Sequence, residues 1–318
     1  MGNNNEFSQS QIEAFFKYLS KEAFNRVPGV YHPDENLYNL AQENGIFILP
    51  VHFYTPIPSK EEIANHSNDK YSTKGIDWND SVQLEYVDKC SIYEKELEDI
   101  TFDKEDKYNF YWNNGAFSHT DAIFYYSLIR MLKPQKIIEI GAGNSTKILL
   151  KSLKFNNSNP SEILSIIEPY PYEDLQLVAE KYNIPLIEKK IQDTTIDVFK
   201  TLQDGDILFY DGSHVSKYGS DVNHFIFNIL PELNSGVYIH IHDIFLPTEY
   251  PENWIEDMNI FWNEQYIVHA FLQFNSSYEV VFSSNYLITN YKSELDEKFS
   301  VTQKLNGNLG GSIWLRKK

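Results

Sequence analysis

The chain has 318 residues, 42% of them apolar and 23% charged, and its 27 Lys and Arg against 45 Asp and Glu give a net charge of −18. This composition is typical of a globular protein with one large domain or two ordinary ones, and it excludes a disordered chain. The strong negative charge repels phosphate backbones and anionic lipids, so we expect neither a nucleic-acid nor a membrane partner. The single cysteine, Cys90, excludes an internal disulfide and cysteine-based zinc motifs.

The first residues, 1–6, carry neither the basic region nor the apolar stretch of a secretory signal. The sequence also has no run of about 18 apolar residues, the length that predicts a transmembrane helix. We therefore expect a cytoplasmic protein in a reducing compartment.

The N-terminal part is expected to form a partly helical extension over residues 1–117. Apolar residues recur at helical spacing from Ile12 to Phe24 and predict a helix over 8–27. The segment 46–58 is too rich in proline for a central strand, so we expect an extended segment there that could act as a lid.

From residue 118 onward the pattern becomes regular. Ser118 and Asp121 predict a capping box that starts a helix ending near Leu132. Apolar runs then alternate with helical patterns: strands are predicted at 136–140, 163–168, 185–188, 207–211 and 237–242, and helices start near 145, 173, 195 and 220. A long aromatic helix at about 255–274 and two strands at 278–283 and 311–316 follow. This alternation predicts a doubly wound α/β domain with a mainly parallel sheet over 118–318.

A glycine-rich turn follows the first of these strands and predicts a ligand site. Its glycines would let a ligand lie against bare backbone at the carboxyl end of the strand. An acid directly before the turn suits a pyrophosphate poorly, and the third glycine of the dinucleotide fingerprint is absent. The acid does suit a cation such as the ammonium of S-adenosylmethionine. The predicted cofactor-binding residues here are Glu139, Gly141, Ala142, Gly143, Asn144 and Ser145.

Two further acids belong to the same predicted site. Glu168 ends the second strand, where an acid is placed to accept both ribose hydroxyls of a nucleoside. Asp193 follows the third strand, where adenine is normally met, although Gln192-Asp193 before two threonines is equally typical of a plain helix cap.

With these residues, the chain resembles the class I S-adenosylmethionine-dependent methyltransferases over about residues 118–318. The motif from Glu139 to Ser145 and the ribose acid Glu168 carry the resemblance, with Ser145 standing where a third glycine is commoner. It implies a Rossmann-like sheet of seven strands whose last two form an antiparallel edge, which 278–283 and 311–316 fit. It also implies that the insertion at about 244–275, rich in aromatic residues, builds the specificity for the methyl acceptor.

Carboxylates and imidazoles end the fourth and fifth strands. Asp211 and His214 follow the fourth strand, while His240, His242 and Asp243 end the fifth. Oxygen and imidazole ligands suit magnesium, manganese, iron or zinc, so a divalent metal ion is a candidate cofactor.

Metal-dependent O-methyltransferases, including the macrocin O-methyltransferase and cephalosporin-hydroxylase-like group, are similar at this point. The resemblance implies that Asp211 and Asp243 are metal ligands and that His214 is the base. His242 stands where that group has an acid, and we take it as the third candidate ligand. The predicted catalytic residues are therefore Asp211, His214 and His242, with Asp211 also near the cofactor.

The leading hypothesis is an S-adenosylmethionine-dependent methyltransferase that acts on a hydroxyl of a small molecule or glycan. A homo-oligomer is compatible with the sequence. Two alternatives stay open: a metal-dependent oxygenase or nicotinamide oxidoreductase on a related fold, and a non-catalytic nucleoside-binding protein. The sequence also leaves open whether a metal or a histidine activates the hydroxyl.

Overall fold

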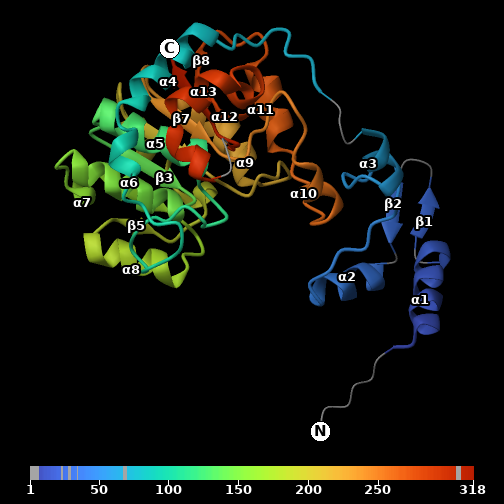
Figure 1. Cartoon of the computed structure of the whole chain (residues 1–318). Coiled ribbons are helices and arrows are strands. Elements are labelled where there is room, and N and C mark those ends of the chain that lie inside the picture. The colour runs from blue at the N-terminus through green and yellow to red at the C-terminus, as the bar shows by residue number, and fades with distance from the viewer. Residues whose placement is uncertain (1–6, 23, 28–29, 34, 67–69, 306–308) are drawn as a thin grey trace. The chain divides into compact units, whose positions relative to one another are not determined.

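The computed structural model describes residues 7–22, 24–27, 30–33, 35–66, 70–305 and 309–318, and the chain divides into two compact units, Met1–Ser67 and Asn68–Lys318 (Figure 1). The first unit contains α1 (Gln9–Glu22), β1 (Phe24–Val27), β2 (Val30–Pro33), α2 (Glu35–Glu43) and α3 (Lys60–His66). Among the described residues, no helix has the length and apolar character needed to cross a membrane.

The helix predicted over 8–27 is wrong in its last part. The helix α1 ends at Glu22, and Phe24 belongs to β1, which pairs antiparallel with β2. Pro28 disfavours a helical backbone at the residue before it, and strand pairing satisfies the backbone groups that the helix would have used. The segment 46–58 forms neither helix nor strand, and its role as a lid stays a prediction.

The second unit is built on a seven-stranded sheet with the order β5-β4-β3-β6-β7-β9-β8. The strands are β3 (Ile137–Ile140), β4 (Leu164–Ile167), β5 (Leu186–Ile187), β6 (Ile207–Tyr210), β7 (Tyr238–Ile241), β8 (Tyr278–Ser283) and β9 (Ile313–Lys317). The pairs among the first five are parallel, and β9 runs antiparallel to both β7 and β8. The predicted α/β fold with a mainly parallel, Rossmann-like sheet is confirmed.

The central strands are buried on both faces, as the near-continuous apolar runs predict. Because side chains alternate along a strand, Ile207 and Phe209 belong to one core and Leu208 and Tyr210 to the other. The first core packs the sheet against α4 (Asp80–Ser91), α5 (His119–Leu132), α6 (Asn144–Phe155) and α8 (Glu173–Tyr182). The second packs it against η3 (Ile196–Thr201), η4 (Phe225–Ile229), η5 (Leu230–Glu232) and α11 (Glu264–Leu272).

Helical elements cover both faces of this sheet (Figure 1). The helical elements described in this unit are α4 (Asp80–Ser91), η1 (Glu94–Leu97), α5 (His119–Leu132), α6 (Asn144–Phe155), α7 (Pro160–Ile163), α8 (Glu173–Tyr182), η2 (Ile191–Asp193), η3 (Ile196–Thr201), α9 (Asp221–His224), η4 (Phe225–Ile229), η5 (Leu230–Glu232), α10 (Glu252–Glu256), α11 (Glu264–Leu272), α12 (Ser284–Asn290), α13 (Lys292–Lys298) and η6 (Ser300–Leu305).

Three predicted helices differ from those observed. The helix near 195 is the 3-10 helix η3, and the helix near 220 is the short α9 continued by the π-helical η4. The long helix predicted over 255–274 is divided into α10 and α11. Asn259 has a left-handed backbone with a φ of 54°, which a continuous helix does not allow, and α11 starts afresh after Asn263.

Residues 70–117 pack with the sheet, and the division between the units falls after Ser67 rather than near the expected residue 117. Val87 and Leu97 are fully buried in the same core as α5 and α6. Polar contacts also join this segment to the sheet domain, since Arg130 on α5 forms an ion pair of 2.7 Å with Glu96. The apolar residues of this segment follow no regular spacing, so the sequence did not predict that the segment packs with the sheet.

The predicted capping box at the start of α5 is not formed. The Ser118 hydroxyl donates to the carbonyl oxygen of Trp112 at 2.7 Å. The buried carboxylate of Asp121 instead accepts hydrogen bonds from the backbone N–H groups of Gly311 at 2.9 Å and Ser312 at 3.1 Å. Asp121 therefore ties α5 to the entry of β9.

Asp206 anchors the entries of β3 and β6. Its buried carboxylate accepts backbone hydrogen bonds from Gln135 at 3.0 Å, Lys136 at 2.8 Å and Gln203 at 2.8 Å. We expect Asp206→Ala to lower the free energy of unfolding in urea by about 2–4 kcal/mol, because three donors lose their acceptor. Asp206→Asn keeps one acceptor oxygen, so its free energy of unfolding should fall by less than that of Asp206→Ala. An Asp206→Ala variant as stable as the wild type would contradict this role.

Candidate active site

The turn between β3 and α6 lies against the end of β6. Gly141 has a φ of +73°, and a Cβ atom on it would stand 1.8 Å from the carbonyl oxygen of Asp211. Only glycine fits this position, for reasons of both backbone conformation and space. Gly143 has an extended backbone with a φ of 175°, and its added Cβ would approach the Tyr172 hydroxyl at 3.0 Å. Gly143 therefore leaves room beside Tyr172.

Glu139 is fully buried at the end of β3, beneath this turn. Its Oε2 accepts a hydrogen bond from the Thr146 hydroxyl at 2.6 Å, while its Oε1 has no hydrogen-bond partner among the described residues. Burial raises the pKa of Glu139 to about 8. A buried carboxylate oxygen without a donor is costly, so the position fits a cationic group of a ligand lying on the turn.

A cavity of about 550 Å³ opens over the turn, within the size range of small-molecule sites. Of the predicted residues, it is lined by Ala142, Gly143, Asn144, Ser145 and Asp211. Sequence reasoning missed other lining residues, including Lys104, Tyr111, Phe117 and Tyr172. Three of these come from the irregular segment before α5, which has no periodic signal.

Four predicted cofactor residues are not among those that line this cavity: Glu139 and Gly141, which lie at the turn, and Glu168 and Asp193. Glu168 is half-buried directly after β4, and its Oε1 accepts a hydrogen bond from the backbone of Tyr170 at 2.8 Å. Asp193 is exposed at the end of η2. Their proposed contacts with ribose and adenine stay predictions.

The ends of β6 and β7 bring Asp211, His214 and Asp243 together. His214 Nε2 lies 3.2 Å from Asp211 Oδ1 and 3.5 Å from Asp243 Oδ2. One ligand atom from each of the three residues lies within 4.8 Å of the others, a spacing that could hold a metal ion. His214 and Asp243 both have left-handed backbones, with φ values of 59° and 55°. Such conformations cluster at functional sites, where the surrounding structure holds them.

His242 stands beside this group, but the third member of the group is His214, where the sequence-based prediction had His242. Its Nδ1 lies 3.4 Å from Asp243 Oδ2, and its Nε2 lies 3.7 Å from Asp121 Oδ2. The buried Asp121, which the sequence predicted only as part of a helix cap, thus faces the ring from α5. His240 is a core residue, because its ring stacks on Phe209 with the ring centroids 3.9 Å apart.

Glu264, at the start of α11, is a residue of the site that sequence reasoning missed. Its buried Oε2 lies 2.9 Å from His214 Nδ1. A proton on Nδ1 that is held by Glu264 leaves Nε2 directed at Asp211 and Asp243. The Trp262 ring packs on His214 with the ring centroids 4.2 Å apart. No local signal could have found Glu264, which lies fifty residues from His214 along the chain.

The charges of this group compensate one another. Burial alone would lower the pKa of His214, but its hydrogen bonds to Asp211 and Glu264 raise that pKa to about 10. Burial opposes ionisation of Asp211, yet His242 and His214 lower its pKa to about 2. The pKa of His242 is also raised, because Asp243 and Asp211 outweigh its burial. Two imidazolium groups thus pair with the surrounding carboxylates.

Comparison with known proteins identifies a family for the part of the chain that carries the glycine turn. Residues 138–244 match a family model described as a methyltransferase domain. An uncharacterized protein of Archaeoglobus fulgidus is 30% identical over 174 residues, which are 51% of this chain and 77% of that protein.

Two solved structures were also matched. One is a methyltransferase of Podospora anserina bound to S-adenosylhomocysteine, with 14% identity, a TM-score of 0.33 and coverage of 86% of this chain and 99% of that chain. The other is a SAM-dependent methyltransferase of Archaeoglobus fulgidus, with 15% identity, a TM-score of 0.32 and coverage of 62% and 94%.

The buried Glu139 generates a prediction about pH. In the folded protein, the Glu139 carboxyl keeps its proton up to about pH 8. In the unfolded chain, the same carboxyl has the ordinary pKa of 4.5 and loses its proton at lower pH. Stability should therefore fall as pH rises from about 4.5 to 8. We expect the free energy of unfolding of ligand-free Glu139→Gln to fall by about 2–4 kcal/mol less over this pH range than that of the wild type. Urea unfolding at several pH values measures the difference. Glu180→Gln, at an exposed carboxylate of α8, is the control, and equal pH slopes in the two variants would contradict the assignment.

Proposed function

Because the chain belongs to the class I S-adenosylmethionine-dependent methyltransferases, we propose that it methylates a hydroxyl oxygen of a small-molecule or glycan acceptor. The observation that carries this proposal is the convergence of Asp211, His214 and Asp243 beside the glycine turn. Asp211 belongs both to this group and to the lining of the cofactor cavity, so a hydroxyl held by the group would lie next to the cofactor.

The residues around the turn fit S-adenosylmethionine. The cofactor, when bound, supplies an activated methyl group on a sulfonium. The unpaired Oε1 of Glu139 would receive its ammonium, and Gly143 leaves space beside the Tyr172 ring. Glu168 would accept hydrogen bonds from the ribose hydroxyls, and Asp193 would lie toward adenine.

The group on the rim also fits a divalent cation. Asp211, His214 and Asp243 would hold it, with His242 beside them. Carboxylate oxygens favour magnesium or manganese, and the imidazole suits iron or zinc. Such a cation, when bound, lowers the pKa of a hydroxyl in contact with it. Glu264 then orients His214 toward the ion. Without an ion, His214 Nε2 would accept the hydroxyl proton only in molecules that have first lost the Nε2 proton, a fraction that the raised pKa of His214 keeps small near neutral pH.

Aromatic side chains of the segment after β7 support a ring-shaped acceptor. Trp262 packs on His214, and the rings of Trp254 and Tyr250 lie 5.4 and 6.3 Å from that of Trp262. Aromatic faces pack well on sugar rings and planar acceptors. The alternative oxygenase would need two histidines and one carboxylate, and the described residues assemble one histidine with two carboxylates instead.

The ribose contact is tested with Glu168→Ala. We expect the affinity for S-adenosylhomocysteine to fall roughly ten- to a hundredfold, about 1.5–3 kcal/mol, because two hydroxyls lose a charged acceptor. Isothermal titration calorimetry measures this loss, and an unchanged melting temperature shows that the fold is intact. Glu180→Ala on α8 serves as the matched control. Wild-type affinity in Glu168→Ala would remove the ribose role.

The hydroxyl-activating group is tested with Asp243→Asn, which leaves the lining of the cofactor cavity unchanged. We expect elemental analysis to find no metal bound to this variant. We also expect the variant to release no S-adenosylhomocysteine, the product of methyl transfer, when it is incubated with S-adenosylmethionine and a panel of hydroxylated acceptors. The affinity for S-adenosylhomocysteine should stay within about threefold of the wild type, since no cofactor contact is removed. The exposed Asp197→Asn is the control.

Chelation should abolish turnover reversibly if a metal is required, and His214→Ala should abolish it in either version. Activity that resists chelation together with a fully active His214→Ala variant would overturn both versions. Oxygen consumption without methyl transfer would favour the oxygenase instead.

A further inference from the structure

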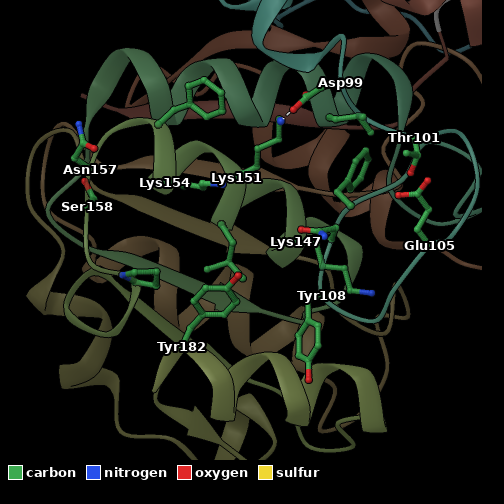
Figure 2. A pocket seen from close by; sticks show the side chains of 16 residues that line it. Asp99, Thr101, Glu105, Tyr108, Lys147, Lys151, Lys154, Asn157, Ser158 and Tyr182 are labelled. Atoms are coloured by element: carbon green, nitrogen blue, oxygen red, sulfur yellow. Dashed lines mark hydrogen bonds and ion pairs between the residues drawn. The ribbon is translucent and has the colours of Figure 1, made fainter.

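A second cavity, of about 660 Å³, lies between α6 and the segment 99–110 (Figure 2). Asp211, His214 and Asp243 do not line it, and Lys147 is the one described residue that lines both this cavity and the cofactor cavity. We propose that this cavity is a binding site for an organic anion, one that carries a phosphate or carboxylate on a ring or hydrocarbon body. The proposal does not depend on the methyl acceptor.

Three lysines from successive turns of α6 line the cavity. Lys147, Lys151 and Lys154 are spaced by four and three residues, which places them on one face of the helix. Figure 2 shows them together with the acids of the lining, Asp99 and Glu105. The whole chain has 45 acidic and 27 basic residues and is strongly negative. The lining of this cavity has three lysines and two acids, so its net charge is positive.

Lys147 lacks a good partner for its charge. Its side chain is only 3% exposed, and its nearest carboxylate oxygen is Asp174 Oδ2, at 3.8 Å. That oxygen already accepts a hydrogen bond from Lys104 at 2.6 Å. Burial lowers the pKa of Lys147, which reflects the poor compensation. The Lys147 ammonium has no hydrogen-bond acceptor among the described residues, and an anion in the cavity would supply one.

The other two lysines differ in their availability. Lys151 forms an ion pair of 2.6 Å with Asp99, and this carboxylate largely neutralises the Lys151 charge. Lys154 is exposed on the next turn, and the described residues offer it no ion pair. Lys147 and Lys154 therefore remain to attract an anion, against the single carboxylate of Glu105.

The rest of the lining fits a ring or hydrocarbon body. Leu150, Phe110, Phe155 and the rings of Tyr108 and Tyr182 contribute apolar surface, so a free inorganic ion would use only part of the site. An anion attached to an apolar body would bind more tightly than the ion alone. The lysines would contact its charge, and burial of the body against the apolar lining would add hydrophobic free energy to binding.

The test uses 1-naphthyl phosphate as the probe, titrated into the full chain saturated with S-adenosylhomocysteine so that the cofactor cavity is filled. We expect saturable binding, with 1-naphthol and inorganic phosphate each binding at least about tenfold more weakly, because each lacks one half of the recognition. Lys154→Glu should weaken binding of the probe by about tenfold or more. Lys304→Glu, at an exposed lysine of η6, makes the same change in net charge and should leave the affinity unchanged.

Three results would overturn the proposal: no binding of the naphthyl phosphate, equal affinities in Lys154→Glu and Lys304→Glu, or inorganic phosphate binding as tightly as the probe. Lys147→Met adds a test of the buried ammonium, with a further loss of affinity expected. Because Lys154 is exposed, its variant keeps the test decisive even if Lys147→Met does not fold. Methyl transfer is measured separately, so failure here leaves the proposed function standing.

Discussion

Gly141 and the backbone carbonyl of Asp211 lie so close that a single added carbon would stand 1.8 Å from the carbonyl oxygen. This contact presses the turn after β3 against the end of β6, and Asp211 N–H donates back to the Ile140 carbonyl at 2.8 Å. The cofactor cavity and the group of Asp211, His214 and Asp243 therefore share one piece of backbone. A larger residue at 141 would separate the place where the methyl group is held from the place where the hydroxyl would be activated.

The group of Asp211, His214 and Asp243 and the neighbouring His242 depend on carboxylates from outside the parallel strands. Glu264 on α11 holds one nitrogen of His214, and Asp121 on α5 faces His242. Both carboxylates are buried, so each needs its cationic partner as much as it orients that partner. Asp121 also accepts the backbone hydrogen bonds at the entry of β9, which couples the position of His242 to the antiparallel edge of the sheet.

The cofactor cavity and the lysine-lined cavity both lie along α6 and are lined by different turns of it. The N-terminal turn of α6 presents backbone and small side chains to the cofactor cavity, whereas its later turns present lysines to the second cavity. Lys147 lies between them. The segment before α5 closes both, since Lys104 and Tyr111 line the first and Tyr108 and Phe110 line the second. A stretch without regular secondary structure thus completes two sites.

The sequence by itself determined the parallel sheet, the glycine turn and the rim position of Asp211, His214 and Asp243. These features follow from local pattern: apolar runs make buried strands, and residues directly after parallel strands meet at one edge of the sheet. Tertiary structure alone decided which histidine joins the two acids, because a left-handed backbone at His214 and the distant Glu264 turn that ring toward them. It also decided the use of Asp121, whose local pattern is typical of a cap, and of residues 70–117, whose spacing has no period. Contacts between residues far apart in the chain leave no trace in a local pattern, and those contacts set the final geometry of the site.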